Sequence, residues 1–211
     1  MTWMGHASVL IEIDGVVVLV DPIFGKTGPY RRAAPAPLSP DQLPHVDLVV
    51  LTHGHHDHLD TRSLRAIAGR FPDVVFVTPL GLSRFLPRAC RNKMELGWWQ
   101  GTTLRGVQVC LVPAQHWHMR IGVDVDRALW AGVVVRGSRS VYHTGDTGYF
   151  GGFKTIGRAF PDLDVAVMPM GAYEPRWFMG DQHMAPEHSL QGFQEVGARY
   201  LVPMHWGTFD L

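Results

Sequence analysis

The sequence is poor in cysteine: its 211 residues include only Cys90 and Cys110, and no Cys-x-x-Cys motif. A structural disulfide would need chance geometry, so we expect a reducing compartment and predict a cytoplasmic protein. No apolar run reaches the roughly 18 residues that a membrane helix needs. The first residues, MTWMGHASVLIEIDG, lack a basic segment followed by an apolar one, so they are not expected to be a signal peptide.

Neither sign of charge is in excess. Lysine plus arginine and aspartate plus glutamate both number 19, so the formal net charge is zero. This balance does not favour a nucleic-acid or strongly anionic partner. The chain also lacks repeats, low-complexity tracts and a linker, and 46% of its residues are hydrophobic. A chain of this size buries roughly 70% of its unfolded surface, so we predict one domain over residues 1–211.

Glycine and proline are plentiful, at 23 and 15 residues, which predicts many turns and loops. Asp14-Gly15 separates two apolar β-branched runs and predicts a hairpin. The proline-rich segment over 25–44 is long for a connector, so we expect it to form a rim or a lid.

The remaining elements follow from apolar runs and from helical spacing. Further strands are predicted in VDLVVLTH, VVFVT, TTLRGVQVCLVPA, RALWAGVVVRG, SRSVYHTG, LDVAVMPM and YLVPMH. Helices are predicted in TRSLRAIAGR, where Thr61 is placed as the cap, and in LGLSRFL, FKTIGRAF and APEHSLQGFQEVGA. Because strands come in two sets with helices between them, we expect α/β layers with two sheets inside and helices outside.

The segment LTHGHHDHLD, residues 51–60, places four histidines and two aspartates directly after a predicted buried strand. In an extended or irregular segment, residues two apart can point the same way, so His53 and His55 can converge. Asp57 and His58 can converge on a neighbouring point, while His56 should face away. Imidazole and carboxylate together suit zinc, iron or manganese rather than calcium or magnesium. The alternative is a histidine-rich surface loop that binds nothing.

Three more apolar runs stop at a histidine or an aspartate: LVPAQHWH, VYHTGDTG and YLVPMHWG. Together with HGHHDH they resemble a known family. HGHHDH fits the His-x-His-x-Asp-His signature of the metallo-β-lactamase fold, which implies a four-layer αββα sandwich with two mixed sheets inside and helices outside. The segments TGDTGYF, GAYEPRWFMGDQHMAPE and MHWGTF, with TWMGHASVLIEIDGVVVLVDPIF and PAQHW, are similar to the branch of N-acylphosphatidylethanolamine-hydrolysing phospholipase D and its bacterial relatives. Relatives often extend beyond both ends, so we expect a minimal or truncated form of the family.

The resemblance implies a site for two divalent transition-metal ions, with zinc expected first and iron or manganese as alternatives. Seven residues would hold them: His53, His55 and His116 for the first ion, Asp57, His58 and His205 for the second, and Asp146 as the bridge between the two. Fold relatives that use two irons for redox chemistry carry glutamate at the position of His55, so this histidine favours hydrolysis. Since every ligand position is filled, a purely non-enzymatic scaffold is not expected.

Two ions about 3.5–4 Å apart can share a water and lower its pKa toward about 7, so no serine or cysteine nucleophile is required. His183 follows the EPRWFM run and is predicted to be an acid–base group or a transition-state donor. It would form the catalytic group together with Asp57 and Asp146. The alternative role for His183 is a loop histidine that supports the lip of the site.

For two residues near the first predicted strands, the sequence allows either a functional or a structural role. Asp21 would either orient a ligand histidine or stabilise the turn before Pro22. His6 would either line the site or be a buried, hydrogen-bonded histidine.

The segment around EPRWFM is open in the same way. Arg176 would either meet an anionic phosphate, or pack on Trp177 or pair with Glu174. An apolar acyl groove and a plain core position are equal alternatives for a cluster of four residues: Trp177, Phe178, Met179 and Met184.

The leading functional hypothesis is a metal-dependent hydrolase of phosphodiesters, with a small-molecule or lipid-derived substrate. The alternative is a lactonase or another carbonyl-ester hydrolase of the same fold; EPRWFM and HWGTF favour the first. Nucleases of this fold insert an extra domain and carry basic surface, and neither is visible, so no nucleic-acid partner is expected. No transmembrane segment is predicted, and peripheral membrane contact and the oligomeric state stay open.

Overall fold

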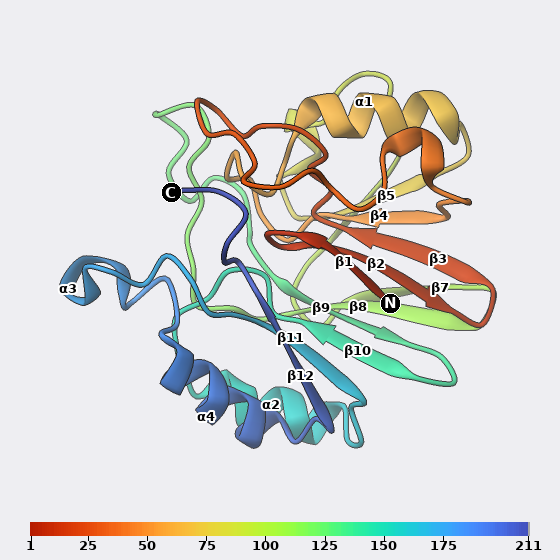
Figure 1. Ribbon diagram of the computed structural model, residues 1–211. Helices are drawn as coiled ribbons and strands as arrows, with labels where there is room; N and C mark the ends of the chain where they lie inside the picture. Colours follow the sequence, from red (N-terminus) through yellow and green to blue (C-terminus); the bar gives the residue numbers. More distant parts are fainter. Residues whose placement is uncertain (211) are drawn as a thin grey trace.

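A computed structural model describes residues 1–210, and it consists of two six-stranded sheets packed face to face. Helix α1 (Thr61–Arg70) covers the outer face of one sheet. Helices α2 (Gly152–Ala159) and α4 (Pro186–Val196) cover the outer face of the other (Figure 1). The predicted four-layer αββα sandwich is therefore confirmed. No helix within residues 1–210 combines the length and apolarity that a membrane crossing requires.

The first sheet is built from the N-terminal part of the chain. Its strands in spatial order are β1 (Thr2–Gly5), β2 (Ser8–Ile13), β3 (Val16–Val20), β4 (Leu48–Val50), β5 (Val75–Pro79) and β6 (Asn92–Leu96). The β2–β3 hairpin turns at Asp14 and Gly15, whose φ angles of 49° and 76° are those that a tight two-residue turn requires. Strands β3 to β6 then run parallel. Strand β6 was not predicted, because its residues NKMEL have a weak β pattern and lie at an exposed edge.

The second sheet follows in the chain. Its spatial order is β12 (Tyr200–Met204), β11 (Val165–Pro169), β10 (Ser140–His143), β9 (Gly132–Arg136), β8 (Val107–Val112) and β7 (Gly101–Leu104). Strands β7 to β10 are antiparallel, whereas β10, β11 and β12 are parallel. The run predicted as one strand over TTLRGVQVCLVPA is two strands joined by a turn, with Arg105 at φ 47° and Gly106 at φ 86°.

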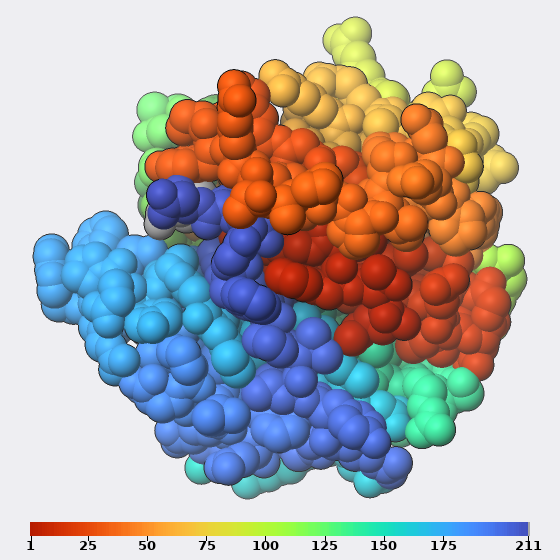
Figure 2. Space-filling view, viewed as in Figure 1, coloured from red at the N-terminus to blue at the C-terminus, as the bar shows by residue number. Residues whose placement is uncertain are grey.

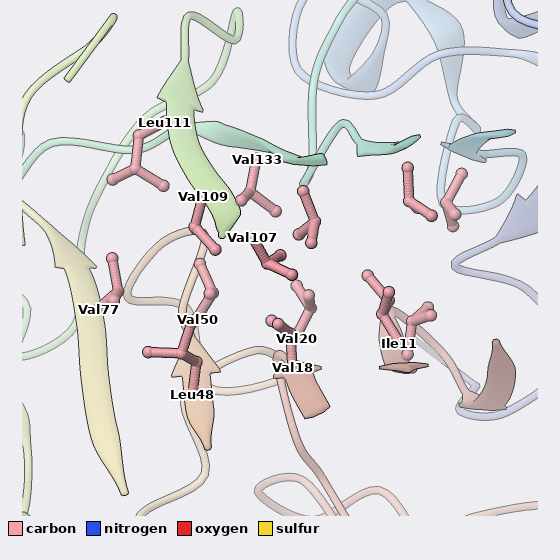
Figure 3. Packing of buried hydrophobic residues seen from close by; sticks show 14 of the residues in the cluster. Ile11, Val18, Val20, Leu48, Val50, Val77, Val107, Val109, Leu111 and Val133 are labelled. Carbon is pink, nitrogen blue, oxygen red and sulfur yellow. The ribbon is translucent and has the colours of Figure 1, made fainter. Parts of the chain in front are cut away.

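The main core lies between the two sheets. Alternate residues of each strand point inward, and most are valine, leucine or isoleucine (Figure 3). From one sheet come Val18 and Val50, and from the other Val109 and Val133, all with at most 1% of their surface exposed. Because both inner faces are dry, the loops that leave these strands are mounted on a rigid base.

The outer helices begin and end at identifiable signals. The predicted cap of α1 at Thr61 is wrong by one residue: the Asp60 side chain accepts hydrogen bonds from the backbone N–H groups of Arg62 and Ser63. A carboxylate one residue earlier reaches these free N–H groups, so Thr61 becomes the first helical residue. Helix α4 lies within the predicted segment APEHSLQGFQEVGA: it starts at Pro186 and ends at Val196, followed by Gly197 with φ 72°.

Three smaller segments complete the chain. A 3-10 turn over Pro40–Gln42 is the one regular piece of the predicted loop over 25–44 apart from a single bridge between Thr27 and Tyr30. The segment predicted as a helix in LGLSRFL is reduced to a 3-10 turn over Ser83–Phe85. One helical turn that the sequence did not predict, α3 (Arg176–Met179), projects at the left of Figures 1 and 2. Cys90 and Cys110 are both buried and unpaired with each other.

Candidate metal centre

The loop over residues 51–60 leaves strand β4 and carries the histidine-rich motif. Leu51 continues the sheet by donating its N–H to the Val77 carbonyl at 3.0 Å. The chain then turns, and His58 N–H and Leu59 N–H both bond to the His55 carbonyl. Within this turn His56 is exposed, with its Nε2 3.3 Å from the Arg120 carbonyl, as the predicted outward orientation requires.

Three ring nitrogens of the predicted first metal position meet. His53 Nε2 lies 3.0 Å from His55 Nδ1, and His116 Nε2 lies 3.1 Å from the same atom. His116 reaches this point from the loop after β8, 61 residues along the chain from His55. The predicted trio is therefore brought together from two different sheets.

The predicted second position also forms a compact group. Asp57 Oδ2 lies 3.4 Å from His205 Nε2 and 3.6 Å from His58 Nε2. His6 joins these residues, because its Nε2 is 2.9 Å from the same carboxylate oxygen. Candidate ligand atoms of all four lie within 4.8 Å of one another. His6 is thus both buried and part of the site, so its two proposed roles are not exclusive.

Asp146 lies between the two groups. Its Oδ2 is 3.1 Å from both His58 Nε2 and His205 Nε2. The same oxygen is 3.9 Å from His53 Nε2 and 4.0 Å from His116 Nε2. One carboxylate oxygen therefore faces histidines of both groups, which is the placement that a bridging ligand needs.

Asp21 contacts the loop over 51–60 through hydrogen bonds with Thr52 and His58. Its carboxylate accepts the N–H of Thr52 at 2.8 Å and the hydroxyl of Thr52 at 2.6 Å. The same carboxylate lies 2.7 Å from His58 Nδ1, so it fixes which ring nitrogen of His58 faces the cluster. Asp21 is fully buried, and of its two proposed roles the structure shows the orienting one.

Burial keeps the first group neutral. It lowers the pKa of His55 to about 4 and that of His116 to about 3, and it holds the pKa of His53 well below its usual range. A neutral imidazole is the form that binds a metal ion. At pH 7 this trio therefore needs no proton removed before an ion can bind.

The second group holds protons instead. Burial lowers the pKa of His205, but the carboxylates of Asp146 and Asp57 outweigh that effect and raise the pKa to about 9. In the same way, they raise the pKa of His58 well above its usual range. The two positive rings hold the pKa of Asp146 and of Asp57 well below the usual range, although burial opposes this. A divalent cation would take the place of these protons.

Several buried atoms of the cluster lack a hydrogen-bond partner among residues 1–210, among them His55 Nε2 and Asp146 Oδ1. Native interiors pair nearly all such atoms, so each one requires an explanation. Imidazole nitrogen and carboxylate oxygen are the donors that zinc, iron and manganese accept. The residues present therefore fit the predicted metal ions.

Comparison with known proteins agrees with this geometry. A family model described as a beta-lactamase superfamily domain matches residues 17–206. The chain belongs to the metallo-β-lactamase superfamily. This membership confirms the family predicted from the HGHHDH motif.

Two relatives and one solved structure are similar to this chain over nearly its whole length. It is 33% identical, over the whole of its length, to N-acyl-phosphatidylethanolamine-hydrolyzing phospholipase D 1 of Caenorhabditis elegans, and it spans 64% of that protein. It is also 33% identical to a UPF0173 metal-dependent hydrolase of Methanopyrus kandleri, covering 99% of this chain and 84% of the other. Among solved structures, the metallo hydrolase Igni18 of Ignicoccus hospitalis superimposes with a TM-score of 0.76 at 24% identity, covering 97% and 81% of the two chains. That last likeness shows the shared fold.

A cavity of about 560 Å³ opens beside the first histidine group. His55 and His183 form its polar end, and five residues form the rest: Trp117, Met119, Phe178, Met179 and Gln182. His183 Nδ1 lies 3.9 Å from Asp146 Oδ2, so this ring stands between the cluster and the cavity. Burial lowers the pKa of His183, which keeps the ring neutral at pH 7.

The residues of the EPRWFM region whose roles the sequence left undecided lie in three places: the surface, the cavity and the core. Arg176 is exposed and pairs with Glu174 and Glu187, so the structure favours pairing over a free phosphate contact. Phe178 and Met179 line the cavity, but Met184 is fully buried core and Trp177 is 87% exposed.

Sequence reasoning did not find Trp117, Met119 or Arg120. Trp117 is adjacent to a predicted ligand, and this adjacency was the one signal available for it. Nothing in the local sequence distinguishes Met119 or Arg120, because their roles depend on contacts with the loop over 51–60 and with α3.

Proposed function

We propose that this protein is a metal-dependent hydrolase that cleaves phosphodiesters carrying an apolar chain. The observation that supports it is the apolar cavity beside the cluster of seven histidine and aspartate side chains that we propose as metal ligands. A substrate whose chain fills the cavity places its polar end against His55 and His183. Two of the relatives are named phospholipase D enzymes, and the chain spans 64% and 48% of their lengths.

Each predicted ligand has a place in this proposal. His53, His55 and His116 would hold one divalent ion, and Asp57, His58 and His205 the other, with Asp146 shared. Zinc is the proposed metal, and iron or manganese would suit the same donors. Two bound metal ions would lower the pKa of a water, and their positive charge would balance the charge of the phosphoryl oxygens.

The chain's own residues would then orient the substrate and transfer the proton that hydrolysis requires. His183 is neutral, buried and adjacent to both cavity and cluster, so it can donate an N–H to an oxygen that gains charge. Hydrolysis of the phosphodiester breaks the bond from phosphorus to the leaving oxygen. One proton of the attacking water must reach that oxygen, and His183 is the ring best placed to carry it.

Hydrolysis of a neutral ester or lactone is the second candidate. The seven residues that line the cavity include no lysine or arginine, and Arg176 is already paired with two carboxylates. A neutral carbonyl substrate would need no such cation. The comparison of substrate classes must therefore be made directly.

The proposed test measures activity and metal content together. Purified protein is loaded with zinc, iron or manganese and given an N-acyl phosphatidylethanolamine, a soluble aryl phosphodiester and a lactone of matched chain length. We expect the acylated phosphodiester to be the preferred substrate. Turnover of the lactone alone would reject the leading function and support the second.

Variants test the role of His183. His183→Ala should keep its metal ions while turnover falls roughly 10²–10⁴-fold, the usual contribution of an acid–base group. His56→Ala is the matched control, because His56 is exposed on the same side of the fold and faces away from the cluster. Equal damage from both changes would contradict the division of roles.

Two further points of the proposal concern location. Peripheral contact with a lipid surface is supported by Trp177 and Phe178, which are 87% and 67% exposed beside the cavity. A cytoplasmic, reducing location is supported by the two unpaired cysteines.

A further inference from the structure

Arg120 connects two segments that both carry metal-binding residues. Its Nη1 donates to the Gly54 carbonyl at 2.7 Å and, more weakly, to the His55 carbonyl at 3.5 Å. Its Nη2 donates to the Leu59 carbonyl at 2.9 Å. One guanidinium therefore spans the loop that carries His55, Asp57 and His58.

This use of an arginine is unusual because it involves no close carboxylate. Within residues 1–210, no carboxylate oxygen lies within 4.0 Å of the Arg120 guanidinium. The side chain is half-buried, and burial lowers its pKa. Burying a cation is costly, and the negative charges of Asp60 and Asp124 oppose this cost from beyond contact distance. The direct interactions of the guanidinium are its hydrogen bonds with the three carbonyls.

The segment that presents Arg120 is itself held in place. Asp124 accepts the N–H groups of Arg120 and Ile121, both at 2.9 Å, and lies 3.2 Å from His118 Nε2. His118 packs against the metal-binding loop at Gly54, where an added Cβ would lie 2.2 Å from His118 Cε1. The loop and the segment over 116–126 thus fit together closely at two points.

We propose that Arg120 is a positioning residue that holds the loop over 54–59 in register with His116. The first metal position takes His55 from the loop and His116 from the start of the Arg120 segment, so its geometry depends on how these two segments are joined. Without the guanidinium, the carbonyls of Gly54 and Leu59 lose their shared donor. This inference rests on the proposed metal centre, but it does not depend on which substrate is cleaved.

The test uses Co²⁺ as the probe, because its visible absorption reports the geometry of its ligands. Three variants of the full chain are compared with the unchanged protein: Arg120→Met, Arg120→Lys and, as the matched control, Arg127→Met. Arg127 directly follows the segment over 116–126, is exposed, and its side chain makes no hydrogen bond or ion pair among the described residues.

We expect Arg120→Met to bind Co²⁺ about 10–100-fold more weakly and with an altered absorption spectrum, as is typical when a residue that supports metal ligands is lost. Arg120→Lys should restore part of the affinity, since an ammonium group keeps the charge and can donate to one or two of the carbonyls. Arg127→Met should match the unchanged protein.

A separate measurement excludes a purely structural role. The melting temperature of each variant is measured with a chelator present. If Arg120→Met melts lower while its Co²⁺ affinity and spectrum match those of the control, the proposal is wrong. If Arg120→Met does not fold, the Arg120→Lys spectrum decides: a spectrum like that of the control overturns the proposal.

Failure of the proposed function gives a different result. An unchanged protein that binds Co²⁺ but cleaves no phosphodiester would reject the proposed substrate and leave the inference on Arg120 intact. An unchanged protein that binds no Co²⁺ would overturn both.

Discussion

Asp146 is the residue that faces both proposed metal positions. Its Oδ2 lies within 4.0 Å of five histidine nitrogens, whereas Asp57 Oδ2 contacts only the second group and His6. Substitution of Asp146 is therefore predicted to affect both proposed positions, and substitution of a residue of the second group mainly one.

Asp146→Ala should reduce bound metal from about two ions per chain to fewer than one, because both positions lose a ligand. His205→Ala should remove mainly one ion. Elemental analysis of the purified variants measures both, with Asp73→Ala as an exposed carboxylate control. Two ions retained by Asp146→Ala would show that this residue does not bridge the positions.

The pKa of His205 makes the stability of the metal-free protein depend on pH. Its folded-state value, about 9, is raised from the ordinary 6.5. It therefore contributes stability that is fully present below pH 6.5 and is lost as the pH rises through 9. His55 and His116 have lowered values, so they destabilise the fold as the pH falls below 6.5.

In the presence of a chelator, the free energy of unfolding should be greatest near pH 6.5 and fall by about 1–3 kcal/mol toward pH 9. Urea titrations at pH 5.5, 6.5 and 9 measure this change. His205→Gln should lose about half of the alkaline decrease, because Gln cannot release a proton, whereas His58, whose pKa is also raised, still can. A decrease of unchanged size in that variant would mean that another group causes it.

At the scale of elements, the segment after β12 connects the two sheets at the site through hydrogen bonds with His6. Thr208 Oγ1 accepts the N–H of His6 at 2.7 Å, and His205 N–H donates to the His6 carbonyl at 3.0 Å. Trp206 stacks on Trp3 with ring centroids 5.4 Å apart. The position of His6 is thus set by a segment about 200 residues away.

Thr208→Val should destabilise the protein by roughly 1–3 kcal/mol, because the buried N–H of His6 would lose its acceptor without gaining another. Urea unfolding measures the change. Thr103→Val, on an exposed face of β7, is the control and should change stability by less than about 0.5 kcal/mol. Similar effects from both changes would show that the contact contributes little.

At the scale of the whole molecule, apolar surface gathers at the end that carries the site. Trp177 and Phe178 on α3 are exposed, and the segment with Arg120 exposes Ile121, Val123 and Val125 to between 55% and 74%. Figure 2 shows the segment around α3 projecting from the body of the protein. If the substrate is held in a lipid surface, these side chains are the ones that meet it.

Trp177→Ala combined with Phe178→Ala should lower binding to phospholipid vesicles about tenfold or more, since burying an aromatic side chain contributes roughly 1.5–3 kcal/mol. Co-sedimentation with vesicles gives the measurement. Tyr200→Ala is the control: Tyr200 is 67% exposed but begins β12, the strand whose other end leads to His205. Equal binding by the double variant and the control would exclude α3 as the contact.

The sequence by itself determined most of the strands and helices and the residue types available at the proposed site. The Asp14-Gly15 hairpin, the buried strand before His53 and the start of α4 at Pro186 all follow from local rules. The residue types in HGHHDH restrict what the loop can bind, because imidazole and carboxylate together select transition metals. Strand β6 and helix α3 were missed, since neither has a strong local pattern.

The tertiary structure alone decided which side chains meet. His6, Asp21 and His205 all have positive φ angles, of 54°, 43° and 60°, which L-residues adopt only when their surroundings impose them. These backbone conformations aim His6 at Asp57 and Asp21 at His58, and no local pattern encodes them. The contacts of Arg120 with the loop over 51–60 have the same origin: packing between distant segments fixes the loops, and the loops direct the side chains.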